Sequence, residues 1–187
     1  MINLFVNYYR DSNDERRIEI DSVFAKNIDN KQINTYIIES QNRLKFKDFF
    51  NTVNKVSNKA NINIIANSDI YFDETISLAE RIVDNECYAL CRWDVQKDGT
   101  SIFFNRSDSQ DTWIFKGHIK DNVNGDFYLG YRGCDNRIAY ELDKVGYKVR
   151  NVGRTIKTYH LHITGIRNYD HTNKYLVPPP YKMIEPE

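Results

Sequence analysis

The sequence predicts a single α/β domain, and three observations lead to this prediction. Stretches with the pattern of strands and of helices alternate along the chain, as they do in α/β domains. The 187 residues fit one domain and are enough to bury a core. Hydrophobic residues make up 41% of the chain and charged residues 28%, which is ordinary for a globular protein in water.

The first half of the chain predicts three strands and two helices. Apolar runs predict strands at Ile2–Tyr8, 35–38 and Ile62–Ala66, and the first and third are apolar enough for a buried central sheet. A capping box at Ser12 and Glu15 predicts the start of the first helix. Apolar residues recur at helical spacing in both helices: Ile20, Phe24 and Ile28 in the first, and Phe46, Phe49, Phe50 and Val53 in the second.

After the third strand the pattern continues with shorter elements. Asp73 can cap a helix that carries Ile76, Ala79, Ile82 and Val83. A strand is predicted at 87–91. The polar stretch 92–126 contains extended pieces at 101–104 and 113–116, and we expect it to form much of one wall of a site.

The last part of the chain predicts one helix, one strand and a tail. The helix covers about 136–145 and ends at Gly146, and the strand covers 155–163. We therefore expect one domain over residues 1–175. Residues 176–187 contain three consecutive prolines, Pro178 to Pro180, and predict a tail that is extended or poorly ordered.

The charge balance and the hydropathy of the chain argue against two classes of partner, nucleic acids and membranes. Lys plus Arg and Asp plus Glu both total 26, so no general attraction to nucleic acid or to anionic membranes is expected. No apolar run approaches the roughly 18–20 residues that span a bilayer, and the N-terminus lacks the pattern of a signal peptide. Cys87, Cys91 and Cys134 are an odd number at no metal-ligand spacing and predict reduced thiols. Together these features predict a cytoplasmic protein.

The first candidate for chemistry is Asn67-Ser68-Asp69, directly after the strand Ile62–Ala66. In open α/β sheets, ligands gather at the carboxyl ends of strands, so Asp69 can face a shared crevice. A hard cation held there could bridge the phosphates of a nucleotide diphosphate to an oxygen ligand. The alternative is that Asp69 only accepts a backbone amide in a turn.

The second candidate is Asp135, in Gly133-Cys134-Asp135-Asn136 at the entrance to a helix. The positive end of the helix dipole favours an ionised carboxylate there, which suits a general base. The alternative interpretation is an N-cap, for which aspartate is among the best residues.

The third candidate is the pair His160 and His162 in Tyr159-His160-Leu161-His162. Residues two apart in a strand point to the same face, so both imidazoles can reach a metal that Asp69 already holds. Nitrogen and oxygen ligands together are consistent with Mn²⁺ or Mg²⁺. Each histidine could instead be a hydrogen-bonded structural residue.

A sugar-binding wall is predicted by indole rings beside charged side chains, because sugars present apolar ring faces bordered by hydroxyls. The candidate residues are Arg92, Trp93, Asp94, Asp111 and Trp113. Both tryptophans could instead be core residues. Arg43, before the second helix, could reach a phosphate.

Three of these segments, in order, resemble motifs of the GT-A-fold glycosyltransferases. Residues 67–72, Asn-Ser-Asp-Ile-Tyr-Phe after an apolar strand, resemble the strand with the Asp-x-Asp motif. Residues 133–149, from Gly-Cys-Asp-Asn to Gly-Tyr-Lys-Val, look like the downstream acidic motif, its helix and the next strand. Tyr-His-Leu-His at 159–162 resembles the C-terminal histidine strand. The resemblance covers about residues 2–163 and is to small bacterial and viral members.

The resemblance implies a Rossmann-like α/β/α sandwich with a mixed central sheet. It implies that Asp69 binds the metal, that His160 or His162 completes the coordination, and that Asp135 is the base of an inverting enzyme. Asn7, Tyr8 and Tyr9 would lie near the nucleotide base. Asn67 replaces the first aspartate of Asp-x-Asp, so we expect Asn67, with Ser68 beside it, to contact ribose or sugar hydroxyls rather than the cation.

The leading hypothesis is a Mn²⁺- or Mg²⁺-dependent glycosyltransferase that uses a nucleotide-diphosphate sugar, with a UDP-sugar favoured, and a carbohydrate or other hydroxyl acceptor. One alternative is a non-catalytic domain that binds a nucleotide-sugar or carbohydrate, for example as one module of a larger protein. The other is a metal-dependent hydrolase or nuclease that uses Asp69, Asp135 and the histidine pair. The neutral charge balance argues against a nucleic-acid substrate.

Overall fold

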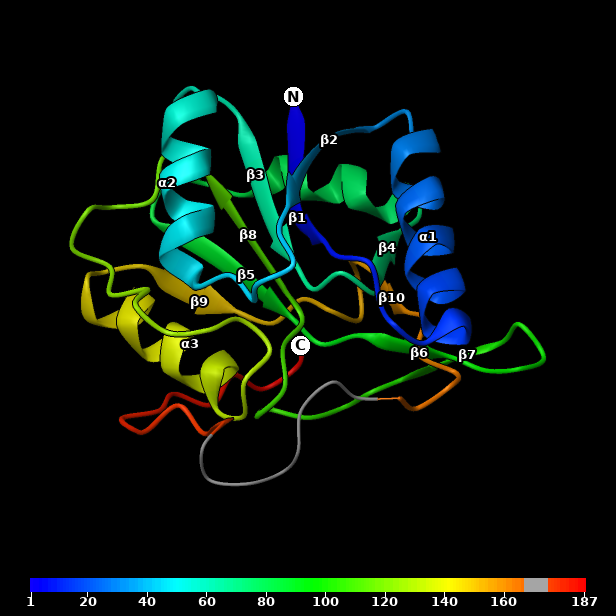
Figure 1. Ribbon diagram of the computed structural model, residues 1–187. Helices are drawn as coiled ribbons and strands as arrows, with labels where there is room; N and C mark the ends of the chain where they lie inside the picture. Colours follow the sequence, from blue (N-terminus) through cyan, green and yellow to red (C-terminus); the bar gives the residue numbers. More distant parts are fainter. Residues whose placement is uncertain (167–174) are drawn as a thin grey trace.

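A six-stranded mixed sheet forms the centre of the protein (Figure 1). The computed structural model describes residues 1–166 and 175–187. The strands run in the order β2 (Ile33–Glu39), β1 (Ile2–Tyr8), β3 (Ile62–Ala66), β8 (Thr112–Lys116), β5 (Glu86–Leu90) and β9 (Lys148–Arg150). Strand β8 is antiparallel to both of its neighbours, and the other pairs are parallel.

Helices cover both faces of this sheet. Figure 1 shows α2 (Phe46–Val56) and α3 (Cys134–Lys144) on one side and α1 (Asp14–Asp29) on the other, where the 3₁₀ helix η1 (Glu74–Arg81) also packs. Side chains of a strand alternate between its two faces, so Phe5 packs with α2 while Leu4 and Val6 pack with α1. The protein is therefore a mixed α/β fold, as the sequence predicts.

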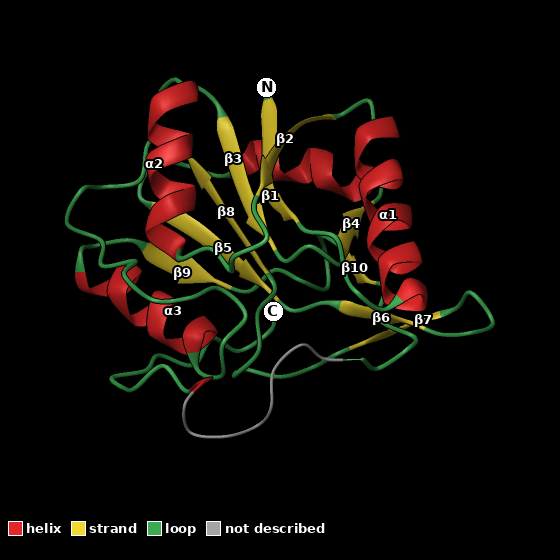
Figure 2. Cartoon of the chain, viewed as in Figure 1, coloured by secondary structure: helices red, strands yellow, loops and turns green. Residues whose placement is uncertain are grey.

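A second, four-stranded sheet lies beside α1 (Figure 2). Its order is β4 (Ile70–Phe72), β10 (Thr158–His160), β6 (Trp93–Val95) and β7 (Ser101–Phe103). Only three residues, Asn67 to Asp69, separate β4 from the central strand β3. Strand β10 pairs with β4 on one side and β6 on the other, which places His160 opposite Ile70 and Asp94. The small sheet thereby brings His160 to the end of β3.

Several predicted elements differ from the structure in their details. Asn13, not Ser12, caps α1, because its side chain accepts the amide of Arg16 at 2.9 Å. Ile28 is 56% exposed, so the apolar face of α1 ends earlier than predicted. The predicted strand 155–163 is only three residues long, and the short strands β4 and β6 were not predicted. None of the helices in the described part of the chain has the length and apolar character that a bilayer-spanning helix needs.

Residues 176–187 are extended, which is one of the two predicted alternatives, and they are fixed to the domain. Val177 and Ile184 are buried in the core on the α2–α3 face. Backbone amides of the segment donate to carbonyls of the domain: Val177 to Arg132 at 2.8 Å, Lys182 to Asn136 at 2.9 Å, Ile184 to Ser107 at 2.9 Å and Glu187 to Asn151 at 2.8 Å. Apolar burial explains this docking, because each buried side chain contributes roughly 1.5–3 kcal/mol.

Replacing Ile184 by alanine tests whether this segment belongs to the core. Ile184 is 6% exposed, so the substitution removes buried methyl groups and leaves a cavity. We expect the free energy of unfolding in urea to fall by about 2–4 kcal/mol. Val56→Ala, at a position 45% exposed, is the control and should change it by less than about 1 kcal/mol. Equal, small losses in both variants would contradict a docked segment.

Candidate metal centre

Asp69, His160 and His162 come together at the junction of the two sheets. One potential ligand atom from each lies within 4.8 Å of the others. The approach is fixed by the backbone, because β4 pairs with β10 and the amide of Leu161 donates to the Asp69 carbonyl at 2.9 Å. The prediction that these three side chains meet is confirmed.

Hydrogen bonds turn both imidazoles toward Asp69. His160 Nδ1 lies 2.7 Å from Asp94 Oδ1, and its Nε2 lies 3.3 Å from Asp69 Oδ2. His162 Nε2 lies 2.7 Å from the carbonyl of Ile166, and its Nδ1 lies 3.9 Å from Asp69 Oδ2. A carbonyl or carboxylate oxygen accepts a hydrogen bond, so Nδ1 of His160 and Nε2 of His162 carry a hydrogen. When a ring is neutral, its other nitrogen therefore directs a lone pair at the space beside Asp69, which is the arrangement that metal-binding histidines use.

Arg16 is the residue of this centre that the sequence prediction missed. Its buried guanidinium lies 2.5 Å from Asp69 Oδ2 and 2.9 Å from Glu19 Oε2, and it donates to the Leu161 carbonyl at 3.1 Å. Glu19 in turn accepts from the amide and hydroxyl of Thr164. Its position four residues before Ile20 indicates that Arg16 lies on the buried face of the helix, but not that it meets Asp69.

The charges of the centre determine the protonation of its members. Burial alone would raise the pKa of Asp69, but His160 and Arg16 outweigh it and hold this pKa well below its usual range. Burial would lower the pKa of His160, yet the Asp69 and Asp94 carboxylates raise it to about 9. Burial and the nearby Arg16 lower the pKa of His162. Without a cation, the centre thus holds an ionised aspartate, a protonated His160 and a neutral His162, and a metal would displace the proton of His160.

The centre opens into a cavity of about 860 Å³, within the range of small-molecule sites. Most of the site residues predicted from sequence line it: Asn7, Tyr9, Arg43, Asn67, Ser68, Asp69, Arg92, Asp111, Asp135, His160 and His162. The docked C-terminal segment contributes Leu176, Tyr181 and Met183 to the wall. Residues far apart in sequence therefore share one cavity at the carboxyl ends of β1 and β3.

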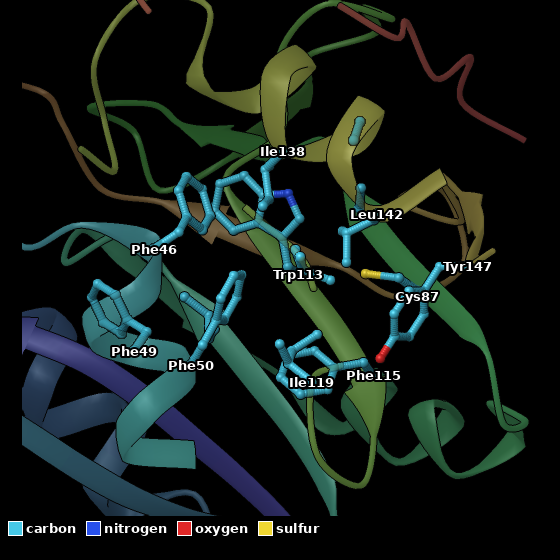
Figure 3. Packing of buried hydrophobic residues seen from close by; sticks show 14 of the residues in the cluster. Phe46, Phe49, Phe50, Cys87, Trp113, Phe115, Ile119, Ile138, Leu142 and Tyr147 are labelled. Carbon is cyan, nitrogen blue, oxygen red and sulfur yellow. The ribbon is translucent and has the colours of Figure 1, made fainter. Parts of the chain in front are cut away.

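Three predicted binding residues do not line this cavity. Trp113 is 2% exposed and packs edge-on against Phe46 in the core under α2 (Figure 3). Trp93 packs on Phe103 and donates its Nε1 hydrogen to the Gly153 carbonyl at 2.9 Å. The Tyr8 hydroxyl lies 2.9 Å from Asp21 on α1. The prediction that Trp113 binds the ligand is wrong, because Trp113 is a core residue. Tyr8 and Trp93 are half-buried and do not line this cavity.

Asp94 lies behind the metal centre rather than in the main cavity. Its Oδ1 faces His160 Nδ1 and also accepts from Arg92 Nε at 2.7 Å. It lines a second cavity, of about 680 Å³, that also reaches His160 and His162. Asp94 therefore contacts a candidate ligand, His160, and does not line the main cavity.

Asp135 lies in the first turn of α3 but does not cap it. The N-cap is Gly133, whose φ of +77° and close approach to Tyr181 and Val177 leave no room for a side chain. The Asp135 carboxyl accepts from Cys134 Sγ at 3.0 Å and lines the cavity. Burial, with the nearby Asp111 carboxylate, raises the pKa of Asp135 to about 8, so the expectation from the helix dipole alone is wrong.

The cavity also collects positive charge. Five arginines of the described chain line it: Arg16, Arg43, Arg92, Arg106 and Arg132. Arg43 donates to the Leu129 carbonyl at 3.1 Å and lies over the ring of Tyr131. Four aspartates, Asp69, Asp108, Asp111 and Asp135, line the same cavity, and Arg16, Arg92 and Arg106 each pair with one of them, so the lining carries both charges. Arginine forks suit phosphate oxygens, which is the contact that these side chains could offer a ligand. Comparison of the sequence with protein-family models and with curated proteins found no match.

Proposed function

We propose that this chain is a metal-dependent glycosyltransferase that transfers a sugar from a nucleotide-diphosphate sugar, with a UDP-sugar favoured, to a hydroxyl acceptor. The observation that carries the proposal is the Asp69–His160–His162 cluster beside an arginine-lined cavity of about 860 Å³. A cation on the cluster and the arginines around it provide for a ligand with two phosphates. The fold we associate with this function is a Rossmann-like α/β/α sandwich of the GT-A type, which agrees with helices on both faces of a mixed sheet.

The candidate ligands, one carboxylate oxygen and two imidazole nitrogens, suit a divalent cation that binds both oxygen and nitrogen. Asp69 supplies a carboxylate oxygen, and His160 and His162 each supply a nitrogen whose lone pair is fixed by a hydrogen bond on the other side of the ring. Oxygen-only sites favour Mg²⁺, whereas imidazoles favour transition metals. Of the two ions predicted from sequence we therefore favour Mn²⁺. When bound, the cation supplies charge neutralisation at the diphosphate.

The other residues of the cavity have separate roles in this proposal. Arg16, Arg43 and Arg132 stabilise the departing diphosphate, where negative charge accumulates in the transition state. Asn7, Tyr9, Asn67 and Ser68, at the ends of β1 and β3, contact the nucleoside or the sugar hydroxyls. Asp135 accepts the proton of the acceptor hydroxyl. Arg92 and Asp111 line the side of the cavity that receives the sugar.

Calorimetric titration of UDP with and without Mn²⁺ tests the proposal. We expect Mn²⁺ to tighten UDP binding at least about tenfold, because the cation would bridge the diphosphate to Asp69 and the histidines. UMP is the matched control, since it lacks the second phosphate and should show a much smaller effect of Mn²⁺. Absence of UDP binding under both conditions would refute the proposed function.

A further inference from the structure

A chain of hydrogen bonds and ion pairs runs behind the metal centre, with Arg92 at its middle. Arg92 Nε donates to Asp94 Oδ1 at 2.7 Å, and the same oxygen faces His160 Nδ1 at 2.7 Å. In the other direction, Arg92 Nη1 donates to Asp111 Oδ2 at 3.0 Å. Asp111 Oδ1 then accepts from Asn67 Nδ2 at 2.8 Å. The chain thus begins at one candidate ligand, His160, and ends two residues before another, Asp69.

Arg92 is held firmly in this position. Its side chain is largely buried, and its guanidinium lies 4.2 Å from the centroid of the Phe104 ring. Burial would lower its pKa, but the carboxylates of Asp111 and Asp94 more than compensate, so it stays charged. Its hydrogen bonds to Asp94 and Asp111 come from two different nitrogens, Nε and Nη1, of the planar guanidinium. Arginine alone among the side chains offers this fixed fork, and lysine cannot reproduce it.

From this geometry we infer that Arg92 and Asp94 are positioning residues of the metal centre. Arg92 fixes Asp94, and Asp94 holds His160 with its Nε2 toward Asp69. Through Asp111 and Asn67, Arg92 also fixes the segment that carries Asp69. The two chain segments that supply ligands are therefore aligned by one guanidinium. The inference rests on the metal site of the proposed function and assigns a role that the sequence prediction, sugar binding, did not give to these residues.

Charge and geometry predict opposite results for Arg92→Gln, which makes this variant the sharpest test. The substitution removes a positive charge near the centre, so electrostatics alone would strengthen the binding of a cation. Loss of positioning would weaken it instead, because Arg92 holds Asp94, and disturbing the direct partner of a metal-binding histidine costs about 10–100-fold in metal affinity. We expect Mn²⁺ to bind Arg92→Gln at least about tenfold more weakly than wild type in a calorimetric titration.

Arg106→Gln is the matched control. Arg106 also lies over the Phe104 ring, lines the same cavity and pairs with an aspartate, but that aspartate is Asp108, which is outside the chain of bonds that reaches His160. The substitution Arg106→Gln removes the same positive charge but leaves the bonds from His160 to Asn67 in place. We expect its Mn²⁺ affinity to be unchanged or slightly higher than that of wild type.

Thermal melts monitored by circular dichroism show whether Arg92→Gln is folded. A second variant tests the inference independently of that result. Asp94→Glu keeps the charge but moves the acceptor oxygen away from His160, so positioning predicts weaker Mn²⁺ binding, by about 3–10-fold, and electrostatics predicts no change. Wild-type affinity in folded Arg92→Gln or in Asp94→Glu would overturn the inference and leave the proposed function standing. Failure of the wild-type protein to bind Mn²⁺ or another divalent cation would overturn both.

Discussion

Replacing Asp69 by asparagine is expected to lower the affinity for Mn²⁺ at least about 100-fold and to remove the effect of Mn²⁺ on UDP binding. Asp69 is the only acidic member of the ligand cluster found in the described residues, and both histidines direct a ring nitrogen at its Oδ2. Asparagine keeps the shape but loses the anionic ligand that a hard cation prefers. The measurement is a titration of Mn²⁺ into each protein, followed by UDP at saturating Mn²⁺.

The control for this variant is Asp108→Asn. Asp108 lines the same cavity and pairs with Arg106, so the change in net charge is the same. Because Asp108 is not part of the cluster, its variant should retain Mn²⁺-dependent UDP binding within about threefold. If Asp69→Asn still binds Mn²⁺ as tightly as Asp108→Asn does, the cation is held elsewhere.

Asp135→Asn is expected to reduce the rate of donor turnover by about 10²–10⁴-fold while leaving UDP affinity within about threefold of wild type. Asparagine cannot accept a proton from the hydroxyl nucleophile, but it occupies the same space beside Cys134. Hydrolysis of a UDP-sugar, with water as acceptor, measures the rate without knowledge of the natural acceptor. Equal rates in the two proteins would contradict the assignment of Asp135 as the base.

The raised pKa of Asp135 has a consequence for pH dependence that can be measured in the same assay. Burial and the Asp111 carboxylate keep the carboxyl protonated until about pH 8, so wild-type activity should rise as the pH passes through this value. Stability has the opposite dependence. The folded pKa lies above the unfolded value of about 3.9, so the contribution of the protonated form is full below pH 4 and is lost as the pH rises toward 8. Relative to Asp135→Asn, the wild-type protein should therefore lose stability between pH 5 and pH 8 in urea unfolding.

The strands and helices that the sequence predicts well are those whose own residues show a clear hydrophobic pattern. Strands β1 and β3 appear in the sequence as apolar runs because both of their faces are buried. Helix α2 shows its four buried residues, Phe46, Phe49, Phe50 and Val53, at helical spacing. The meeting of Asp69 with His160 and His162 was also predicted, but the pairing of β4 with β10 that brings them together was not.

The features that sequence alone did not give depend on contacts between distant segments. The environment of Trp113 is decided by α2, which packs over it, and not by its polar neighbours in sequence. Arg16 and Asp69 are 53 residues apart, and nothing local predicts that their side chains touch. The docking of residues 176–187 depends on Val177 and Ile184 fitting a core that only the folded domain presents. Nothing near Asp94 in the sequence indicates that it contacts His160, because the pairing of β6 with β10 brings these two residues together.

The most direct test of the metal centre is a crystal of the protein soaked with UDP and Mn²⁺ and measured for anomalous scattering from manganese. We predict one strong peak in contact with Asp69 Oδ2, His160 Nε2 and His162 Nδ1, with the diphosphate of UDP on its open side. A bound UDP without such a peak, or a peak away from these three side chains while Arg16 still pairs with Asp69, would contradict the account.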